Sequence, residues 1–142
     1  MSRTRIPDWL RERVADQARH RCGYCLMSEA VVGMCLELDH LIPEALGGVT
    51  EEENLWLACP SCNARKAHRV LGIDPATGES VRLFDPRRQS WSEHFCWIES
   101  GSRIQGLTPV GRATVVTLQL NRPILVSARR GWVAVGWHPP RS

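Results

Sequence analysis

The chain lacks any long hydrophobic run. Charged residues or prolines interrupt every apolar stretch before it reaches the ~18 residues that a membrane-spanning helix needs. The N-terminal segment 1–7 has no apolar core of the kind found in secretory signals, so we expect a cytoplasmic protein. Internal repeats and low-complexity stretches are also missing. With 142 residues, 43% of them hydrophobic and 23% charged, the composition is that of an ordinary globular domain.

Lysine is nearly absent, and acidic residues are missing from the last part of the chain. Lys66 stands alone against 17 arginines, and residues 100–142 carry six arginines but no Asp or Glu. The formal net charge is +3 at pH 7. Because the guanidinium fork binds phosphate through two hydrogen bonds, this asymmetry favours a polyanionic partner such as DNA. An arginine-studded solvated surface is the alternative explanation.

Four of the six cysteines stand in two Cys-x-x-Cys pairs. In a chain with no recognisable secretory signal, this spacing favours a metal site in a reducing compartment over disulfides. Four thiolates in two such pairs bind zinc in tetrahedral geometry. Because the cysteines fill every position around the ion, the predicted zinc site is structural. Its ligands would be Cys22, Cys25, Cys59 and Cys62.

The segment between and just after these pairs contains polar residues at fixed spacing. In chain order the pattern is Leu38-Asp39-His40-Leu41-Ile42-Pro43, Gly47-Gly48, Asn54-Leu55, Asn63 and Lys66. Together with the cysteine pairs, it resembles the HNH endonucleases, a branch of the ββα-metal nucleases, in the form with Asp-His at the first position and Asn at the last. The resemblance covers residues 17–70. Residues 81–140 also look like the C-terminal part of small stand-alone bacterial HNH proteins, which has no assigned chemistry.

The resemblance implies an α+β fold and a catalytic site. The core would be a ββα-metal unit, with strand, loop, strand and helix in that order. The activity would be metal-dependent hydrolysis of DNA phosphodiester bonds, with one active site nicking duplex DNA. The family's roles fall on His40 as general base, Asn54 as the residue that orients it, and Asp39 and Asn63 as ligands of the catalytic cation.

These residue types suit that chemistry. Hydrolysis of a phosphodiester needs an activated water, neutralisation of charge on the phosphate and help for the leaving oxygen. A neutral imidazole near pH 7, such as His40, can take a proton from water. The amide oxygen of Asn54 could accept a hydrogen bond from the imidazole and fix its tautomer. Asp39 and Asn63 offer hard oxygen ligands, and the absence of a histidine at the last position favours Mg2+ or Mn2+.

Other charged residues near the motif have two explanations each. Arg65, Lys66 and Arg69, on the helix predicted over 60–70, could contact DNA phosphates, or could form an exposed helix face. Glu37 shares a strand face with Asp39 and could join the metal through water, although a solvated carboxylate is the simpler explanation.

Periodicity and capping signals predict the elements. They are a helix from Asp8 to about His20, strands over 36–39 and 54–58, a helix over 60–70, a strand over 81–84, a hairpin of 95–99 with 103–107, a helix capped by Thr108 and a last helix capped by Asn121. We expect residues 1–142 to form a single domain, in which an extension over 71–142 packs on the nuclease core over 17–70.

Two other functions stay open. The first is a non-catalytic zinc-ribbon module that binds nucleic acid or protein, which would not need Asp39, His40 and Asn63 together. The second is an RNase that uses the same site. The sequence shows no helix-turn-helix or other base-reading module, so it does not indicate a target sequence. It leaves open whether the protein is a monomer or a homodimer.

Overall fold

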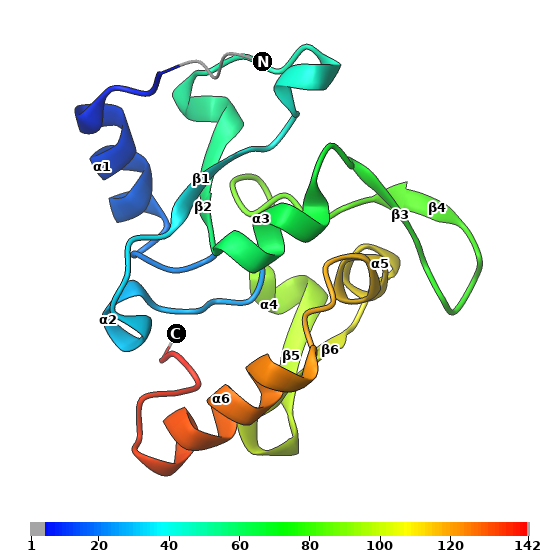
Figure 1. Cartoon of the computed structure of the whole chain (residues 1–142). Helices are drawn as coiled ribbons and strands as arrows, with labels where there is room; N and C mark the ends of the chain where they lie inside the picture. Colours follow the sequence, from blue (N-terminus) through cyan, green and yellow to red (C-terminus); the bar gives the residue numbers. More distant parts are fainter. Residues whose placement is uncertain (1–4, 142) are drawn as a thin grey trace. The chain divides into compact units, whose positions relative to one another are not determined.

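The structure, a computed structural model, describes residues 5–141 and divides into two compact units between Val70 and Leu71. Both units combine short helices with two-stranded antiparallel sheets (Figure 1), so the predicted α+β class is confirmed. No helix in the described part of the chain is long and apolar enough to cross a membrane.

The N-terminal unit contains the predicted order of strand, loop, strand and helix. Its elements are α1 (Asp8–Gln17), α2 (Glu29–Val32), β1 (Glu37–His40), the 3-10 turns η1 (Glu44–Leu46) and η2 (Glu52–Asn54), β2 (Leu55–Ala58) and α3 (Pro60–Lys66). β1 and β2 pair antiparallel, with Asp39 opposite Trp56 and His40 opposite Leu55. Leu10 and Val14 of α1 pack with Leu55, so an apolar core backs the sheet.

Both long helices of this unit end earlier than predicted, where the backbone takes a positive φ. α1 ends at Gln17 rather than near His20, because Arg19 has a φ of 55°. α3 ends at Lys66 because Ala67 has a φ of 50°. Lys66 is therefore the last residue of α3.

The second cysteine pair sets the start of α3. Pro60 occupies the first helical turn, where its missing N–H is not needed. Cys59 is the N-cap residue, and its Sγ accepts a hydrogen bond of 3.4 Å from the backbone N–H of Cys62. One cysteine therefore caps the helix and is also a predicted zinc ligand.

The C-terminal unit is built on two hairpins and three α-helices. Its elements are β3 (Leu71–Ile73), β4 (Ser80–Arg82), α4 (Trp91–His94), β5 (Phe95–Ile98), η3 (Glu99–Gly101), β6 (Arg103–Gly106), α5 (Pro109–Thr117) and α6 (Pro123–Ala134). The predicted hairpin is confirmed as β5 with β6. α5 lies directly against β6: a Cβ at Gly106 would come within 2.4 Å of the Arg112 nitrogen.

The two predicted caps of this unit have different outcomes. Thr108 caps α5 as expected, with its Oγ1 accepting from the Gly111 N–H at 3.0 Å. The prediction for Asn121 is wrong, because Arg122 is the N-cap of α6. The Asn121 amide instead bonds both backbone groups of Ile104, accepting from its N–H at 2.7 Å and donating to its carbonyl at 2.8 Å.

An ion pair with a buried carboxylate ties the first hairpin of this unit to α5. The fully buried Asp74 carboxylate accepts from Nε and Nη2 of Arg112, both at 2.9 Å, and from Thr77 Oγ1 and the Ala76 N–H at 3.0 Å. The hydrogen bonds from Arg112 hold the pKa of Asp74 well below its usual range. The ionised carboxylate therefore stabilises the folded unit.

Replacing Asp74 tests this contribution. Because the folded state lowers the pKa of Asp74, its stabilising effect is complete above the unfolded pKa of about 4 and is lost as the pH falls further. We expect Asp74→Asn to have a lower Tm than the wild type at pH 7, and the gap between the two to close below about pH 4. Thermal unfolding followed by tryptophan fluorescence measures the gap. A gap that stays constant down to acid pH would contradict this account.

Candidate zinc and nuclease sites

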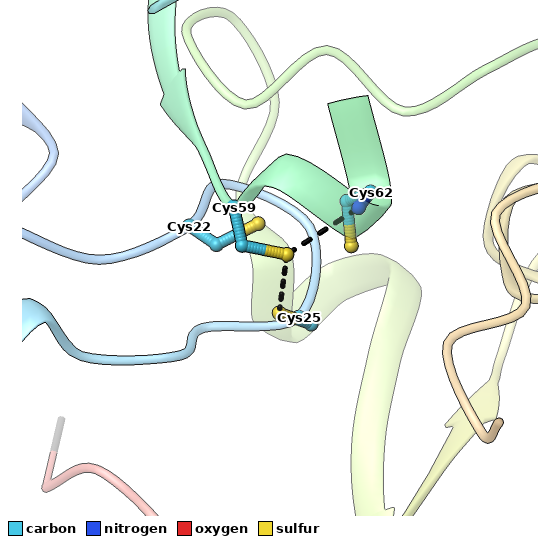
Figure 2. Close-up of side chains that lie close together, drawn as sticks. All are labelled: Cys22, Cys25, Cys59 and Cys62. Carbon is cyan, nitrogen blue, oxygen red and sulfur yellow. Dashed lines mark hydrogen bonds between the residues drawn. The ribbon is translucent and has the colours of Figure 1, made fainter. Parts of the chain in front are cut away.

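The four paired cysteines converge in the N-terminal unit. Their Sγ atoms all lie within 4.8 Å of one another, and all four residues are buried (Figure 2). The Sγ atoms of Cys25 and Cys59 are 3.8 Å apart. A tetrahedral site with Zn–S bonds of ~2.3 Å needs sulfur atoms ~3.8 Å apart. The cluster therefore fits one zinc ion held by four cysteines, as predicted.

Backbone hydrogen bonds hold the first cysteine pair beside the sheet. Cys22 N–H donates to Met27 O at 2.9 Å, and Gly23 N–H donates to Leu57 O of β2 at 2.8 Å. Burial raises the pKa of the Cys22 thiol. Because a zinc ligand must be a thiolate, the ion itself would supply the positive charge that this buried sulfur needs.

Asp39 points from β1 into the interior and is only 3% exposed. Its Oδ2 accepts a hydrogen bond of 2.7 Å from the Tyr24 hydroxyl, and its Oδ1 lies 3.0 Å from the Lys66 ammonium. Burial raises the pKa of the Asp39 carboxyl, while the charge of Lys66 and the hydrogen bond from Tyr24 act against that rise. Burial also raises the pKa of Tyr24, so the phenol keeps the proton that it donates.

Lys66 does not face solvent, and its predicted contact with DNA is wrong. The residue is 2% exposed, and its ammonium donates to Asp39 Oδ1 at 3.0 Å, to His40 O at 3.0 Å and to Leu41 O at 3.3 Å. An ammonium has three N–H donors, and all three are used inside the protein. Lys66 therefore pins the end of α3 to the end of β1.

Asn63 faces the same strand one turn earlier on α3. Its Nδ2 donates to Oε1 of Glu37 at 3.0 Å. Glu37 and Asp39 are two residues apart on β1, and their partners Asn63 and Lys66 are three residues apart on α3. The Glu37–Asn63 and Asp39–Lys66 contacts therefore lie next to each other between β1 and α3. Because a carboxylate can only accept, the NH2 group of Asn63 faces Glu37 and the amide oxygen points away from it.

His40 is the last residue of β1, with 17% of its side chain exposed. Its Nε2 lies 2.9 Å from Thr50 Oγ1 and 3.4 Å from Glu44 Oε1. The carboxylate can only accept, which favours the tautomer with hydrogen on Nε2. Nδ1 has no hydrogen-bond partner among the residues that the structure describes, so its lone pair is available.

Asn54 does not contact the imidazole, contrary to expectation. Its Oδ1 accepts from the Ile42 N–H at 2.8 Å, and its Nδ2 donates to the carbonyls of Ile42 at 3.0 Å and Val49 at 2.8 Å. The amide therefore closes the loop between β1 and β2. Thr50, next to Val49 in that loop, makes the contact that we had assigned to Asn54. The sequence alone could not indicate this contact, because it does not show the path of the loop that carries the Thr50 hydroxyl.

The two arginines predicted to contact DNA have different surroundings. Arg65 is partly buried and donates to Ser61 Oγ, whereas Arg69 is exposed and donates to the Arg65 carbonyl at 2.8 Å. Arg69 therefore has the exposure that a phosphate contact requires. Arg65 is less accessible, with one of its guanidinium nitrogens, Nη1, directed to Ser61.

The arginines of the C-terminal unit are less available than their number implies. Arg112 is held by Asp74, and Arg122 is buried, with Nη1 3.2 Å from Gln119 O. Arg129 is fully buried, donates to Ser102 O at 3.1 Å and Leu120 O at 2.8 Å, and lies over the Trp97 ring. Half of the six arginines after residue 100 therefore form contacts within the protein. The excess of arginine in this part of the chain is for that reason weaker support for a nucleic-acid partner than the number of arginines indicates.

The zinc cluster, the strand bearing Asp39 and His40, and the helix bearing Asn63 all lie within one stretch of sequence. Residues 22–69 match a family model described as HNH endonuclease. The match confirms the predicted resemblance to the HNH endonucleases over this segment. The matched residues run from the first zinc cysteine to Arg69 and cover about a third of the chain. Comparisons with curated proteins and with solved structures gave no match.

Removing zinc should unfold the N-terminal unit. We expect the purified protein to contain one zinc ion per chain, and its chelation to abolish both the fold of the unit and any nuclease activity, even with Mg2+ in excess. Zinc analysis and circular dichroism measure the two effects. Cys25→Ser should act like chelation, whereas Cys35→Ser, at an exposed cysteine outside the cluster, should change neither. Folding and activity that survive the loss of zinc would contradict the structural role.

Replacing Lys66 distinguishes an internal ion pair from a DNA contact. Lys66→Met leaves the Asp39 carboxylate buried without its cation, which should cost about 3–5 kcal/mol of stability. Arg69→Ala should leave the Tm unchanged and weaken DNA binding with a shallower salt dependence. The measurements are thermal unfolding and DNA affinity as a function of salt. If Lys66→Met behaved like Arg69→Ala, the internal role would be refuted.

Proposed function

We propose that this protein is a metal-dependent endonuclease that hydrolyses DNA phosphodiester bonds with His40 as the general base. The environment of the imidazole is the observation that carries the proposal. Nε2 is held by Thr50 and Glu44, while Nδ1 has no partner among the described residues. A general base needs a fixed ring with one available lone pair, and His40 has both.

Glu44 and Thr50 would also support the protonated form of the base. When Nδ1 takes a proton from water, the imidazole becomes positively charged. The Glu44 carboxylate, 3.4 Å from Nε2, then attracts that charge, and Thr50 Oγ1 continues to accept from Nε2–H. The same logic of an orienting acid behind a histidine base operates in hydrolases with catalytic triads.

Asp39 and Asn63 would hold the catalytic cation, Mg2+ or Mn2+. A carboxylate and an amide oxygen are hard ligands that suit these ions. Each carboxylate oxygen has two lone pairs, so Asp39 keeps acceptor capacity beside its bonds to Tyr24 and Lys66. Glu37 takes the NH2 group of Asn63 and leaves the amide oxygen for the ion. When bound, the cation would neutralise charge on the phosphate and stabilise the leaving oxygen.

The loop between β1 and β2 would hold His40 at a fixed position relative to Asp39 and Asn63. Asn54 closes the loop through Ile42 and Val49, and Thr50 extends from it to the imidazole. A side chain at Gly48 is excluded because its Cβ would come within 1.7 Å of the Ile42 carbonyl oxygen. We therefore assign Asn54 a positioning role that acts through the loop. One such site per chain cuts one strand, so nicking is the expected outcome.

A plasmid assay tests this function. Wild-type protein with Mg2+ or Mn2+ should convert supercoiled plasmid to the nicked form, and His40→Ala should reduce the rate by about 10²–10⁴-fold, the usual contribution of a general base. His68→Ala, at an exposed histidine just after α3, is the matched control and should cut at the wild-type rate. Mn2+ binding should persist in His40→Ala, because His40 is not a proposed ligand.

The same assay separates the competing functions. If wild type and His40→Ala behaved alike across divalent metals, the protein would be a zinc-containing binding module rather than a nuclease. Competition between duplex DNA, single-stranded DNA and RNA decides the substrate. Faster cleavage of RNA than of duplex DNA would replace the proposed substrate but keep the site.

A further inference from the structure

Tyr24 lies inside the first cysteine pair and contacts the proposed cation site. It is the residue just before Cys25 and is fully buried. Its hydroxyl donates to Asp39 Oδ2 at 2.7 Å. A side chain carried by the zinc site thus ends on the carboxylate that is expected to bind the second metal.

We propose that Tyr24 is a positioning residue that couples the zinc site to the cation site. Zinc fixes the loop between Cys22 and Cys25, the loop fixes the phenol, and the phenol fixes the orientation of the Asp39 carboxylate. This inference rests on the proposed function only in taking Asp39 as a ligand of the cation.

The two oxygens of Asp39 are held by residues from different parts of the sequence. Tyr24, from the zinc loop, binds Oδ2, and Lys66, from the end of α3, binds Oδ1. The terminal torsion of an aspartate is broad, so a carboxylate with one partner can turn. With two partners it has one orientation, and its remaining lone pairs have fixed directions. Partners behind a metal ligand act in this way in many metal sites.

The remaining contacts of Lys66 extend the coupling to the base. Its ammonium also binds the carbonyl of His40, at 3.0 Å. Displacing Asp39 would therefore disturb the anchor of the strand end that carries the imidazole. Tyr24, Asp39, Lys66 and the His40 backbone form one chain of short hydrogen bonds through the buried side of β1.

Tyr24 is the only tyrosine of the chain, which makes the proposal directly observable. Full-length protein grown with 3-fluorotyrosine carries one fluorine, at this position. We expect Mg2+ to shift its 19F NMR signal and Mn2+ to broaden it, because the cation would lie beside the carboxylate that the phenol binds. Asp39→Asn should abolish both responses with zinc retained, and His40→Ala should keep them.

The outcomes separate this proposal from the nuclease function. If the fluorine signal did not respond to Mg2+ or Mn2+ in a protein that requires these ions to cleave DNA, the coupling would be refuted and the nuclease function would be unaffected. A signal that responds in a protein that cuts no nucleic acid would support the coupling and refute the nuclease. A signal that ignores the metals in an inactive protein would refute both.

Removing the hydroxyl provides a second measurement. Tyr24→Phe keeps the buried ring and should keep the zinc, but we expect the Mg2+ concentration for half-maximal cleavage, and the Kd for Mn2+ measured by electron paramagnetic resonance, to rise about tenfold. Thr114→Val removes a buried hydroxyl from the C-terminal unit and controls for general destabilisation. An unchanged Kd for Mn2+ in Tyr24→Phe, or a loss of Mn2+ binding only in proportion to lost zinc, would overturn the proposal.

Discussion

The buried negative charge of Asp39 is the constraint on which the N-terminal unit depends. An ionised carboxylate removed from water is unfavourable unless a cation and hydrogen bonds replace its hydration. Lys66 supplies the cation and Tyr24 the hydrogen bond, and neither could approach unless α3 and the zinc loop lay against β1. The ionised carboxylate therefore selects the arrangement of helix, loop and strand. It is notable that the chain's only lysine and only tyrosine both serve this one group.

A zinc ion held by the four-cysteine cluster would stabilise that arrangement. Apolar packing contributes as well, with Leu10, Val14 and Leu55 buried together between α1 and β2. Units of about 70 residues often gain stability from a metal or disulfides in addition to their core. Here the predicted zinc ligands have a second function each, because Cys59 also caps α3 and the first pair also carries Tyr24. The structural metal and the candidate catalytic residues are therefore parts of one framework.

The sequence predicted what depends on spacing and missed what depends on the path of the chain. Two Cys-x-x-Cys pairs determine a four-sulfur cluster wherever the intervening loop goes, and alternation along 36–39 determines the strand that carries Asp39 and His40. The sequence could not show that Lys66 turns inward, because an isolated basic residue on a helix looks the same whether it meets phosphate or a buried carboxylate. The partner of Asn54 depended likewise on the path of the loop, which only the folded structure supplies.

The charges around the proposed site explain how it could attract a cation although Asp39 is already paired. Asp39 and Lys66 together are neutral. Glu37 is exposed beside them and contributes one uncompensated negative charge through its link to Asn63. A divalent ion bound there would reverse the sign of the site and leave it with a net positive charge. Such a positively charged site would favour the approach of a phosphate, because the two charges neutralise each other. Lys66, by neutralising Asp39, would thus leave the metal-loaded site positive toward a phosphate.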